Sequence, residues 1–197
     1  MEYSFIEGKR ICLRALRPED LEKGYLRWIN DTDVNAFLAA GTRPVSTSAL
    51  RAYYENITRS ANDVMFAIVV KKTDKYIGNI KLGGIDWTDR RAHCGRMIGD
   101  RASWGKGYGT EALELVLDYA FNTLNLNRVY NTIVSGNIGA MKSCEKAGME
   151  REGVFPQFKF ARGGYKDVVQ YGITRDRYDR LRSKERKATG KKATCAV

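Results

Sequence analysis

Three glycines at alternate positions run directly into an apolar helical pattern, and this junction limits the folds open to the chain. Gly105, Gly107 and Gly109 stand within Trp104–Thr110, and the residues from about Thr110 to Leu124 leave almost no polar helical face. A helix that is apolar around most of its circumference has to be buried against another layer. The stretch therefore predicts a tight, glycine-rich turn followed by a helix that packs on a sheet.

The same turn is suited to binding an anion. The first N–H groups of a helix lack intrahelical partners and carry a partial positive charge, and glycines let phosphate oxygens approach them closely. Lys106, between two of the glycines, adds a cation. The P-loop pattern GxxxxGK[ST] is absent, and the dinucleotide fingerprint GxGxxG fails because Thr110 replaces its third glycine. Taken alone, the pattern is also compatible with an ordinary tight turn.

Length and charge favour a single basic domain with a charged end. The chain has 197 residues and a formal net charge of +11, and this length usually forms one domain. Between residues 182 and 192, six Lys or Arg oppose one Glu, so this segment contributes 6 − 1 = +5. We expect a domain over residues 1–180 and a basic, disordered tail over residues 181–197. A nucleic-acid-binding arm is the alternative for the tail.

Several classes of protein are disfavoured by what the sequence lacks. Four separated cysteines and a single histidine favour reduced thiols and no metal site. Neither a run of about 18 apolar residues nor a signal-peptide pattern is present. We therefore expect a cytoplasmic protein with no membrane partner and no metal.

Hydrophobic periodicity predicts a mixed α/β fold. Helices are expected around residues 21–29, 46–57, 110–124 and 140–146, and residues 30–33 read as a turn or a new N-cap before 34–38. Strands are expected at residues 10–16, 64–70, 76–82, 93–98, 128–134 and 165–173. The strand–helix–strand order in the centre implies a parallel crossover, and the flanking hairpins imply antiparallel neighbours.

Two segments resemble signatures of the GNAT N-acetyltransferases. Trp104–Ala112 is similar to that family's coenzyme A pyrophosphate loop, Gln/Arg-x-x-Gly-x-Gly/Ala, with Trp104 in the Gln/Arg position. Asn137–Met149 resembles the second signature, Asn-x-x-Ala/Ser followed by Glu-Lys-x-Gly-Phe. Residues 14–20, 28–31 and 165–167 resemble the RimJ/RimL-like branch, and the likeness extends from Ile11 to about Tyr178.

The resemblance implies a single-domain GNAT-like fold, with a mixed central sheet of about six to seven strands, flanked by helices. A parallel pair in the middle, residues 96–99 and 128–134, would splay apart around acetyl-CoA, and an amine would attack the thioester directly. Backbone groups of Met97 and Ile98 are implied to hold the pantetheine arm and the acetyl carbonyl. The full set implied to contact the coenzyme is Met97, Ile98, Gly99, Trp104, Gly105, Lys106, Gly107, Tyr108, Gly109, Thr110 and Asn137.

The proton-transfer groups have several candidates. The family often has a tyrosine seven residues after Asn137, but this chain has Cys144 there. Cys144 is a candidate acid or a small core residue, and Ser143 or water could replace it. His93, the lone histidine, is the candidate base because its ordinary pKa lies near neutrality; a structural role is the alternative.

The acceptor is expected to be a small primary amine, such as an amino-sugar nucleotide, because residues 39–44 carry Arg43 and no acid. Polyamines and the N-termini of ribosomal-type proteins are the alternatives, and a CoA-sensing or nucleic-acid-binding module is the non-enzymatic one. A homodimer is one expected assembly. The candidate substrate-side residues are Trp28, Asn30, Asp31, Arg43 and Trp87.

Overall fold

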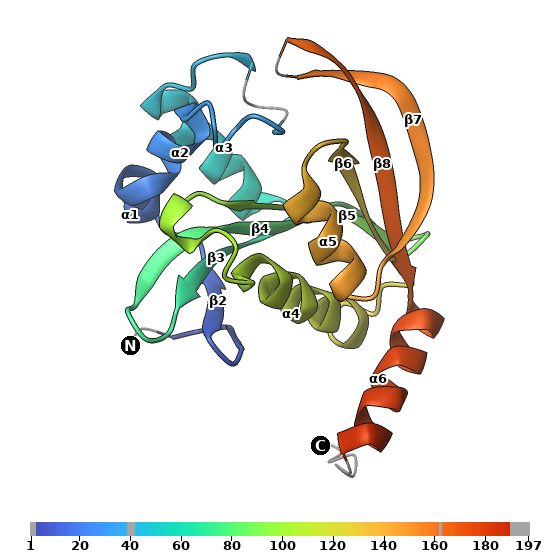
Figure 1. The fold of residues 1–197 in the computed structure, drawn as a ribbon. Helices are drawn as coiled ribbons and strands as arrows, with labels where there is room; N and C mark the ends of the chain where they lie inside the picture. Colours follow the sequence, from blue (N-terminus) through green and yellow to red (C-terminus); the bar gives the residue numbers. More distant parts are fainter. Residues whose placement is uncertain (1–2, 39–41, 162, 190–197) are drawn as a thin grey trace.

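The strands form one twisted sheet with helices on both faces (Figure 1). The computed structural model describes residues 3–38, 42–161 and 163–189. The sheet has eight strands in the order β1-β2-β3-β4-β5-β6-β8-β7. They are β1 (Ile6–Glu7), β2 (Ile11–Ala15), β3 (Val64–Val70), β4 (Lys75–Asp86), β5 (Arg91–Ile98), β6 (Arg128–Val134), β7 (Glu150–Ala161) and β8 (Gly164–Thr174).

The sheet therefore exceeds the expected six to seven strands, and the unforeseen strands are the two edges, β1 and β7. β1 has only two residues, too few to give an alternating pattern. β7 contains Pro156 and bulges between Phe155 and Lys159. An edge strand tolerates proline because one side of its backbone needs no partner strand. The same proline interrupts the strand pattern, so hydrophobic periodicity did not predict β7.

The four predicted helices lie within two residues of observed ones, whereas the helix Arg175–Thr189 was not predicted. Ser46 caps α3 by accepting a hydrogen bond from the Ala49 N–H, and residues 31–38 form turns and bends. The N-terminal helical segment changes from α to π geometry and back. The helical elements are α1 (Pro18–Asp20), η1 (Leu21–Tyr25), α2 (Leu26–Asn30), α3 (Thr47–Arg59), η3 (Arg101–Ser103), α4 (Tyr108–Asn122), α5 (Ile138–Lys146) and α6 (Arg175–Thr189).

Two apolar clusters hold these helices on opposite faces of the sheet. The larger cluster joins the strands to α4 and α5, and it includes Leu113, Leu117 and Phe121, each no more than 1% exposed. The smaller cluster joins η1, α2 and α3 to Ala67 and Met97. α4 is thus buried along most of its circumference, as its composition predicts.

The parallel pair in the middle of the sheet separates at its C-terminal end. β5 and β6 pair only through Arg91↔Arg128, Ala92↔Val129 and His93↔Tyr130. β5 continues to Ile98 and β6 to Val134 without further pairing to each other. The predicted mixed sheet with a splayed central pair is confirmed.

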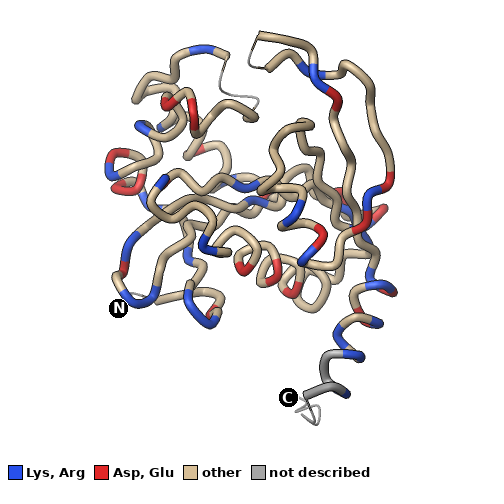
Figure 2. The backbone as a smooth tube through the Cα atoms, in the orientation of Figure 1, with Lys and Arg blue, Asp and Glu red and all other residues tan. Residues whose placement is uncertain are grey.

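The C-terminal boundary differs from the expectation. α6 continues through Thr189, so residues 181–189 extend the helix rather than begin a disordered tail, whereas residues 190–197 lie outside the described part. Near its start, α6 is anchored to the domain because Tyr178 is buried against Phe121 and donates a hydrogen bond to Asp118. Figure 2 marks several Lys and Arg positions along this helix where it leaves the domain.

Candidate active site

The glycine-rich turn ends at the N-terminus of α4 in the geometry that an anion site requires. Gly105 and Gly107 have φ of 72° and 81°, a left-handed region that disfavours other residues. Gly107 is the N-cap of α4 and brings no side chain to the helix end. Gly109 lies in the first helical turn, close to the side chains of Arg96 and Ile98. The first N–H groups of α4 are therefore not covered by a capping side chain.

Arg10, which no pattern in the sequence indicates, connects this turn to β2. Its Nη1 donates to the Lys106 carbonyl at 2.8 Å, and its Nε forms an ion pair with Glu111 at 2.8 Å. The guanidinium also lies over the Tyr108 ring. These contacts connect the turn to the residue before β2, and they place a second cation beside Lys106. Because 96 residues separate Arg10 from Lys106, no local pattern could indicate the contact.

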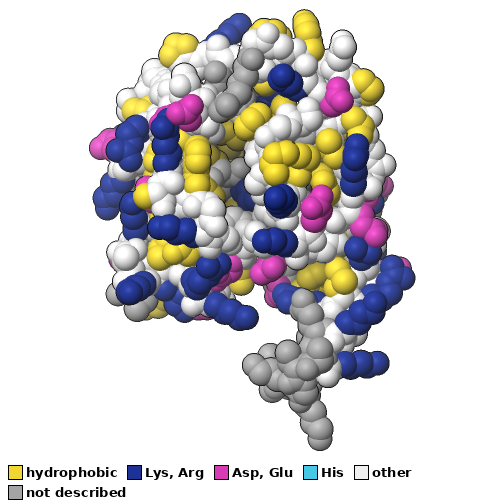
Figure 3. Space-filling view, viewed as in Figure 1, with side chains coloured by type: hydrophobic (Ala, Val, Ile, Leu, Met, Phe, Trp, Pro, Cys, Tyr) yellow, Lys and Arg dark blue, Asp and Glu magenta, His cyan; other side chains and the backbone are white. Residues whose placement is uncertain are grey.

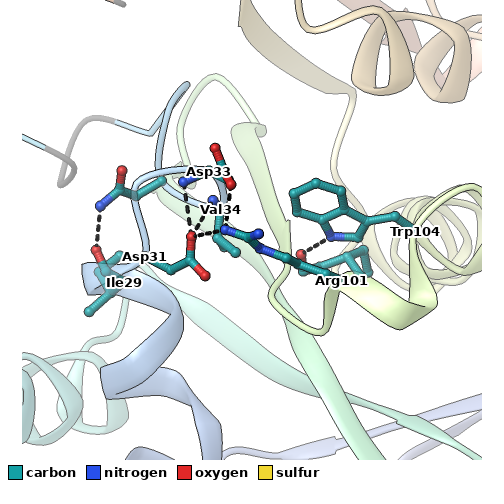
Figure 4. Close-up of polar contacts among 8 residues, drawn as sticks. Ile29, Asp31, Asp33, Val34, Arg101 and Trp104 are labelled. Atoms are coloured by element: carbon teal, nitrogen blue, oxygen red, sulfur yellow. Dashed lines mark hydrogen bonds and ion pairs between the residues drawn. The ribbon is translucent and has the colours of Figure 1, made fainter.

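The start of the loop is tied to β5 and to the N-terminal helices (Figure 4). The Trp104 indole N–H donates to the Ile98 carbonyl at 2.7 Å. Arg101 forms ion pairs with Asp31 and Asp33, each at 2.6 Å. The hydrogen bond from Arg101 is the main reason that the pKa of Asp31 lies below its usual range. Asp31 therefore connects the segment after α2 to η3, at the end of β5.

The backbone of β5 offers hydrogen-bonding groups to the gap between β5 and β6. The Gly99 N–H donates to Ile77 on β4, and successive residues of a strand point their N–H and C=O groups to opposite sides. The backbone groups of Met97 therefore face β4, whereas those of Arg96 and Ile98 face the gap. The Ile98 carbonyl is already bound by Trp104. The N–H of Ile98 is thus oriented toward the gap, whereas the backbone groups of Met97 are oriented toward β4, and the coenzyme contacts of both residues stay predictions.

Residues of the second signature connect α5 to α4. The Asn137 side chain caps α5 by accepting from the Ala140 N–H, and Thr110 donates to Ser143 at 3.1 Å. Cys144 is 0% exposed within the main core cluster, and burial raises the pKa of its thiol. This environment favours a structural role for Cys144 in the core over a role as proton donor. Ser143 is also buried and already engaged.

His93 lies where β5 and β6 begin to separate. Its Nε2 lies 3.2 Å from the Thr132 hydroxyl and accepts from the Thr132 N–H at 3.4 Å. Burial, and then the positive charge of Lys81, lower the pKa of His93. The imidazole is therefore neutral near pH 7, as a general base must be.

Thr132 also lines a pocket on the face of the sheet opposite α4 and α5. The pocket measures about 260 Å³, and its only charged residue is Lys159, which donates to the Phe37 carbonyl at 3.1 Å. Sequence reasoning missed it because its walls come from the 31–38 turns, β6, β7 and β8. The lining residues are Phe37, Thr132, Val134, Phe155, Phe158, Lys159, Val168 and Gln170. Figure 3 shows a hollow between the side of the molecule that carries α1 and α2 and the side that carries α5.

Among the predicted substrate-side residues, only Asn30 and Asp31 border an open hollow, which Glu22 and Arg27 also line. Asn30 is engaged with the backbone of Val45 through both its amide nitrogen and its oxygen. The other three predicted residues lie elsewhere. Trp28 is 4% exposed and packs against Gly99 and Tyr76 as a core residue. Trp87 is hydrogen-bonded to Asn62 near the opposite end of β5, and Arg43 is exposed beside residues 39–41, which lie outside the described part.

Comparison with known proteins settles the family. The model of the acetyltransferase (GNAT) domain matches residues 10–150. The chain belongs to the GNAT family. It is 34% identical over 173 residues to the uncharacterized N-acetyltransferase p20 of Bacillus licheniformis, covering 86% of this chain and 96% of that protein. It is 27% identical over 173 residues to the spermidine N(1)-acetyltransferase of Vibrio cholerae, covering 87% and 96%.

The same fold occurs in a solved structure of a spermidine N-acetyltransferase. The crystal structure of the Vibrio cholerae spermidine N-acetyltransferase in complex with CoA and spermine superposes with a TM-score of 0.78 at 25% identity, covering 86% of this chain and 98% of that chain. The chain is thus an acyl-CoA-dependent N-acetyltransferase, and acetyl-CoA is its cosubstrate. Within the described residues, no group of three or more His, Cys, Asp or Glu could hold a metal ion. No helix of that part is long and apolar enough to cross a bilayer.

Proposed function

We propose that this GNAT enzyme acetylates a small primary amine with an apolar or aromatic body, rather than a polycation. The pocket beside the β5–β6 gap carries this proposal. Phe37, Phe155 and Phe158 supply most of its aromatic surface, and its one charged group is a cation, Lys159. A volume of about 260 Å³ lies below the usual range of about 300–1,000 Å³ for ligand pockets. A compact acceptor is therefore favoured, and an anionic group on it would meet Lys159.

A polyamine is the second candidate, because the named relatives include spermidine acetyltransferases. A polycation needs carboxylates that are free to pair with it. The open hollow beside α2 contains Glu22 and Asp31, but Asp31 is bound by Arg101 and Glu22 lies 3.8 Å from Arg51. These arginines already oppose the two negative charges. The geometry therefore favours the less charged acceptor. Assignment to the RimJ/RimL-like branch, with its protein N-terminal acceptors, stays a prediction.

The proposed mechanism is direct transfer. The turn from Gly105 to Thr110 binds the diphosphate, and the Ile98 N–H donates to the acetyl oxygen as negative charge develops there. The amine enters from the aromatic pocket beside Thr132. Its proton passes through the Thr132 hydroxyl to Nε2 of His93, which is 3.2 Å away. A positioned base of this kind contributes about 10²–10⁴-fold in rate.

An acceptor panel tests the proposal through release of the CoA thiol. The acceptors are 2-phenylethylamine, an amino-sugar nucleotide, spermidine and a peptide with a free N-terminus. We expect kcat/KM for 2-phenylethylamine to exceed that for spermidine at least about 10-fold, because burial of an aromatic ring contributes roughly 1.5–3 kcal/mol. Preference for spermidine would establish the polyamine alternative.

A pair of variants links this preference to the pocket. Phe158→Ala removes a pocket wall, and we expect it to lower kcat/KM for 2-phenylethylamine about 10-fold. Phe160→Ala is the matched control, because Phe160 is an exposed aromatic of the same strand that makes an edge-to-face contact with Tyr165 and does not line the pocket. Equal effects of the two substitutions would remove the support for the pocket.

A further inference from the structure

We propose that Arg96 is the counter-ion of the thiolate that leaves when acetyl-CoA is cleaved. This inference rests on the placement of the thioester in the β5–β6 gap given above. Arg96 belongs to the part of β5 that has separated from β6. Its side chain lies on the face of α4 and α5, opposite that of His93 and Met97. One guanidinium nitrogen donates to the Ala140 carbonyl at 3.0 Å, and both terminal nitrogens lie 3.9 Å from the Cys144 sulfur.

The charge of Arg96 lacks an acidic partner within the described residues. Arg96 is half-buried, and none of the ion pairs found in that part of the chain includes it. Glu111 in α4 is bound by Arg10, and Glu145 in α5 accepts from Tyr171. A partly desolvated cation is costly unless an anion compensates it. Arg96 is therefore prepared to meet an anion that arrives with the ligand.

The coenzyme supplies two anionic groups, the permanent diphosphate and the transient thiolate, and the position of Arg96 favours the thiolate. The diphosphate belongs to the turn after Trp104, which is tied to β5 at Ile98. Arg96 lies two residues deeper along β5, about 6.6 Å at the rise of a strand. Its terminal nitrogens point toward α5 at residue 144, where the family's tyrosine acid would stand. The sulfur of a thioester inserted along the gap belongs near this depth.

The chemistry needs such a charge because a proton donor is lacking there. The amine nitrogen forms the new C–N bond, the C–S bond breaks, and its electron pair remains on sulfur. The amine proton goes to His93 through Thr132, and the thiolate takes a proton from solvent after release. The buried Cys144 thiol positions the guanidinium through the contacts above. An adjacent arginine lowers a thiol pKa; Arg96 acts in this direction on Cys144, where burial outweighs it.

The test measures the pKa of the CoA thiol bound to the protein, which requires no acceptor. Thiolate absorbance is titrated in the CoA complex, with the desulfo-CoA complex as background. We expect the wild-type pKa to lie at least about one unit below 8.5. Arg96→Gln should return it to 8.5 or above and lower kcat about 10–100-fold, with the Kd for desulfo-CoA unchanged. Arg96→Lys should keep part of both effects.

Arg91→Gln is the matched control, because Arg91 lies on the same strand outside the gap and pairs with Asp86 and Asp89. If Arg96→Gln weakens CoA and desulfo-CoA equally and leaves the thiol pKa unchanged, Arg96 binds the diphosphate and the proposal is wrong. An unshifted thiol pKa in the wild-type complex would overturn it as well. Either result leaves the acceptor proposal intact, since that depends on the opposite face of the sheet.

Discussion

Replacing Gly107 with aspartate or with asparagine tests where the diphosphate binds. Gly107 has φ 81° at the N-cap of α4, and a Cβ there would lie 3.2 Å from Nη2 of Arg10. Asn and Asp are the residues other than glycine that best tolerate this conformation, and they have nearly the same size. The strain and the crowding of Arg10 are therefore common to both variants. The difference between G107D and G107N reports the added negative charge.

The expected magnitude follows from Coulomb's law. A carboxylate about 5 Å from a phosphate charge costs roughly 1–3 kcal/mol at an effective dielectric constant between about 80 and about 20. The Kd for CoA should therefore be about 5- to 150-fold higher in G107D than in G107N. Added salt should reduce this ratio, because the turn is exposed. Titration calorimetry with CoA at low and high salt measures both quantities.

Stability of the coenzyme-free protein should change in the opposite direction. Asp and Asn cap a helix about equally, and a negative charge at its N-terminus adds roughly 0.3–1 kcal/mol. G107D should therefore melt at the same temperature as G107N or slightly above it. Gly163 provides a matched pair of control substitutions, because it also has positive φ but lies in the turn between β7 and β8, with open space around its Cβ position. Equal Kd values for G107D and G107N would refute the placement of the diphosphate.

Two further predictions concern residues whose roles the fold clarifies. His93 has a lowered pKa, so the unfolded chain binds its proton more tightly and His93 reduces stability as the pH falls through about 6.5. Between pH 7.5 and 5.5, urea denaturation should show a smaller loss in the free energy of unfolding for His93→Gln than for wild type. Equal losses in the two proteins would contradict this. Trp28→Ala should lower the free energy of unfolding by about 3–5 kcal/mol with little change in acceptor KM. A loss under about 1 kcal/mol with a raised KM would instead return Trp28 to the substrate site.

The central part of the fold could be predicted because its signals are local. The apolar surface of α4, the glycines before it and the strands around it each appear within a short window of sequence. The left-handed φ values at Gly105 and Gly107 are also indicated locally, because glycine is the residue that adopts this conformation without strain. The edges lacked such signals, because β1 has two residues and β7 contains a proline and a bulge.

Only the tertiary structure decided which side chains meet. Lys159 reaches Phe37 across 122 residues, and Arg10 reaches Lys106 across 96. Such contacts depend on strand order and register, which a local pattern of hydrophobicity does not specify. The sequence determined where the chain turns, which segments are buried and that an anion can bind before α4. The packed sheet decided that Trp28 belongs to the core, and that His93 and Arg96 flank the gap on opposite faces.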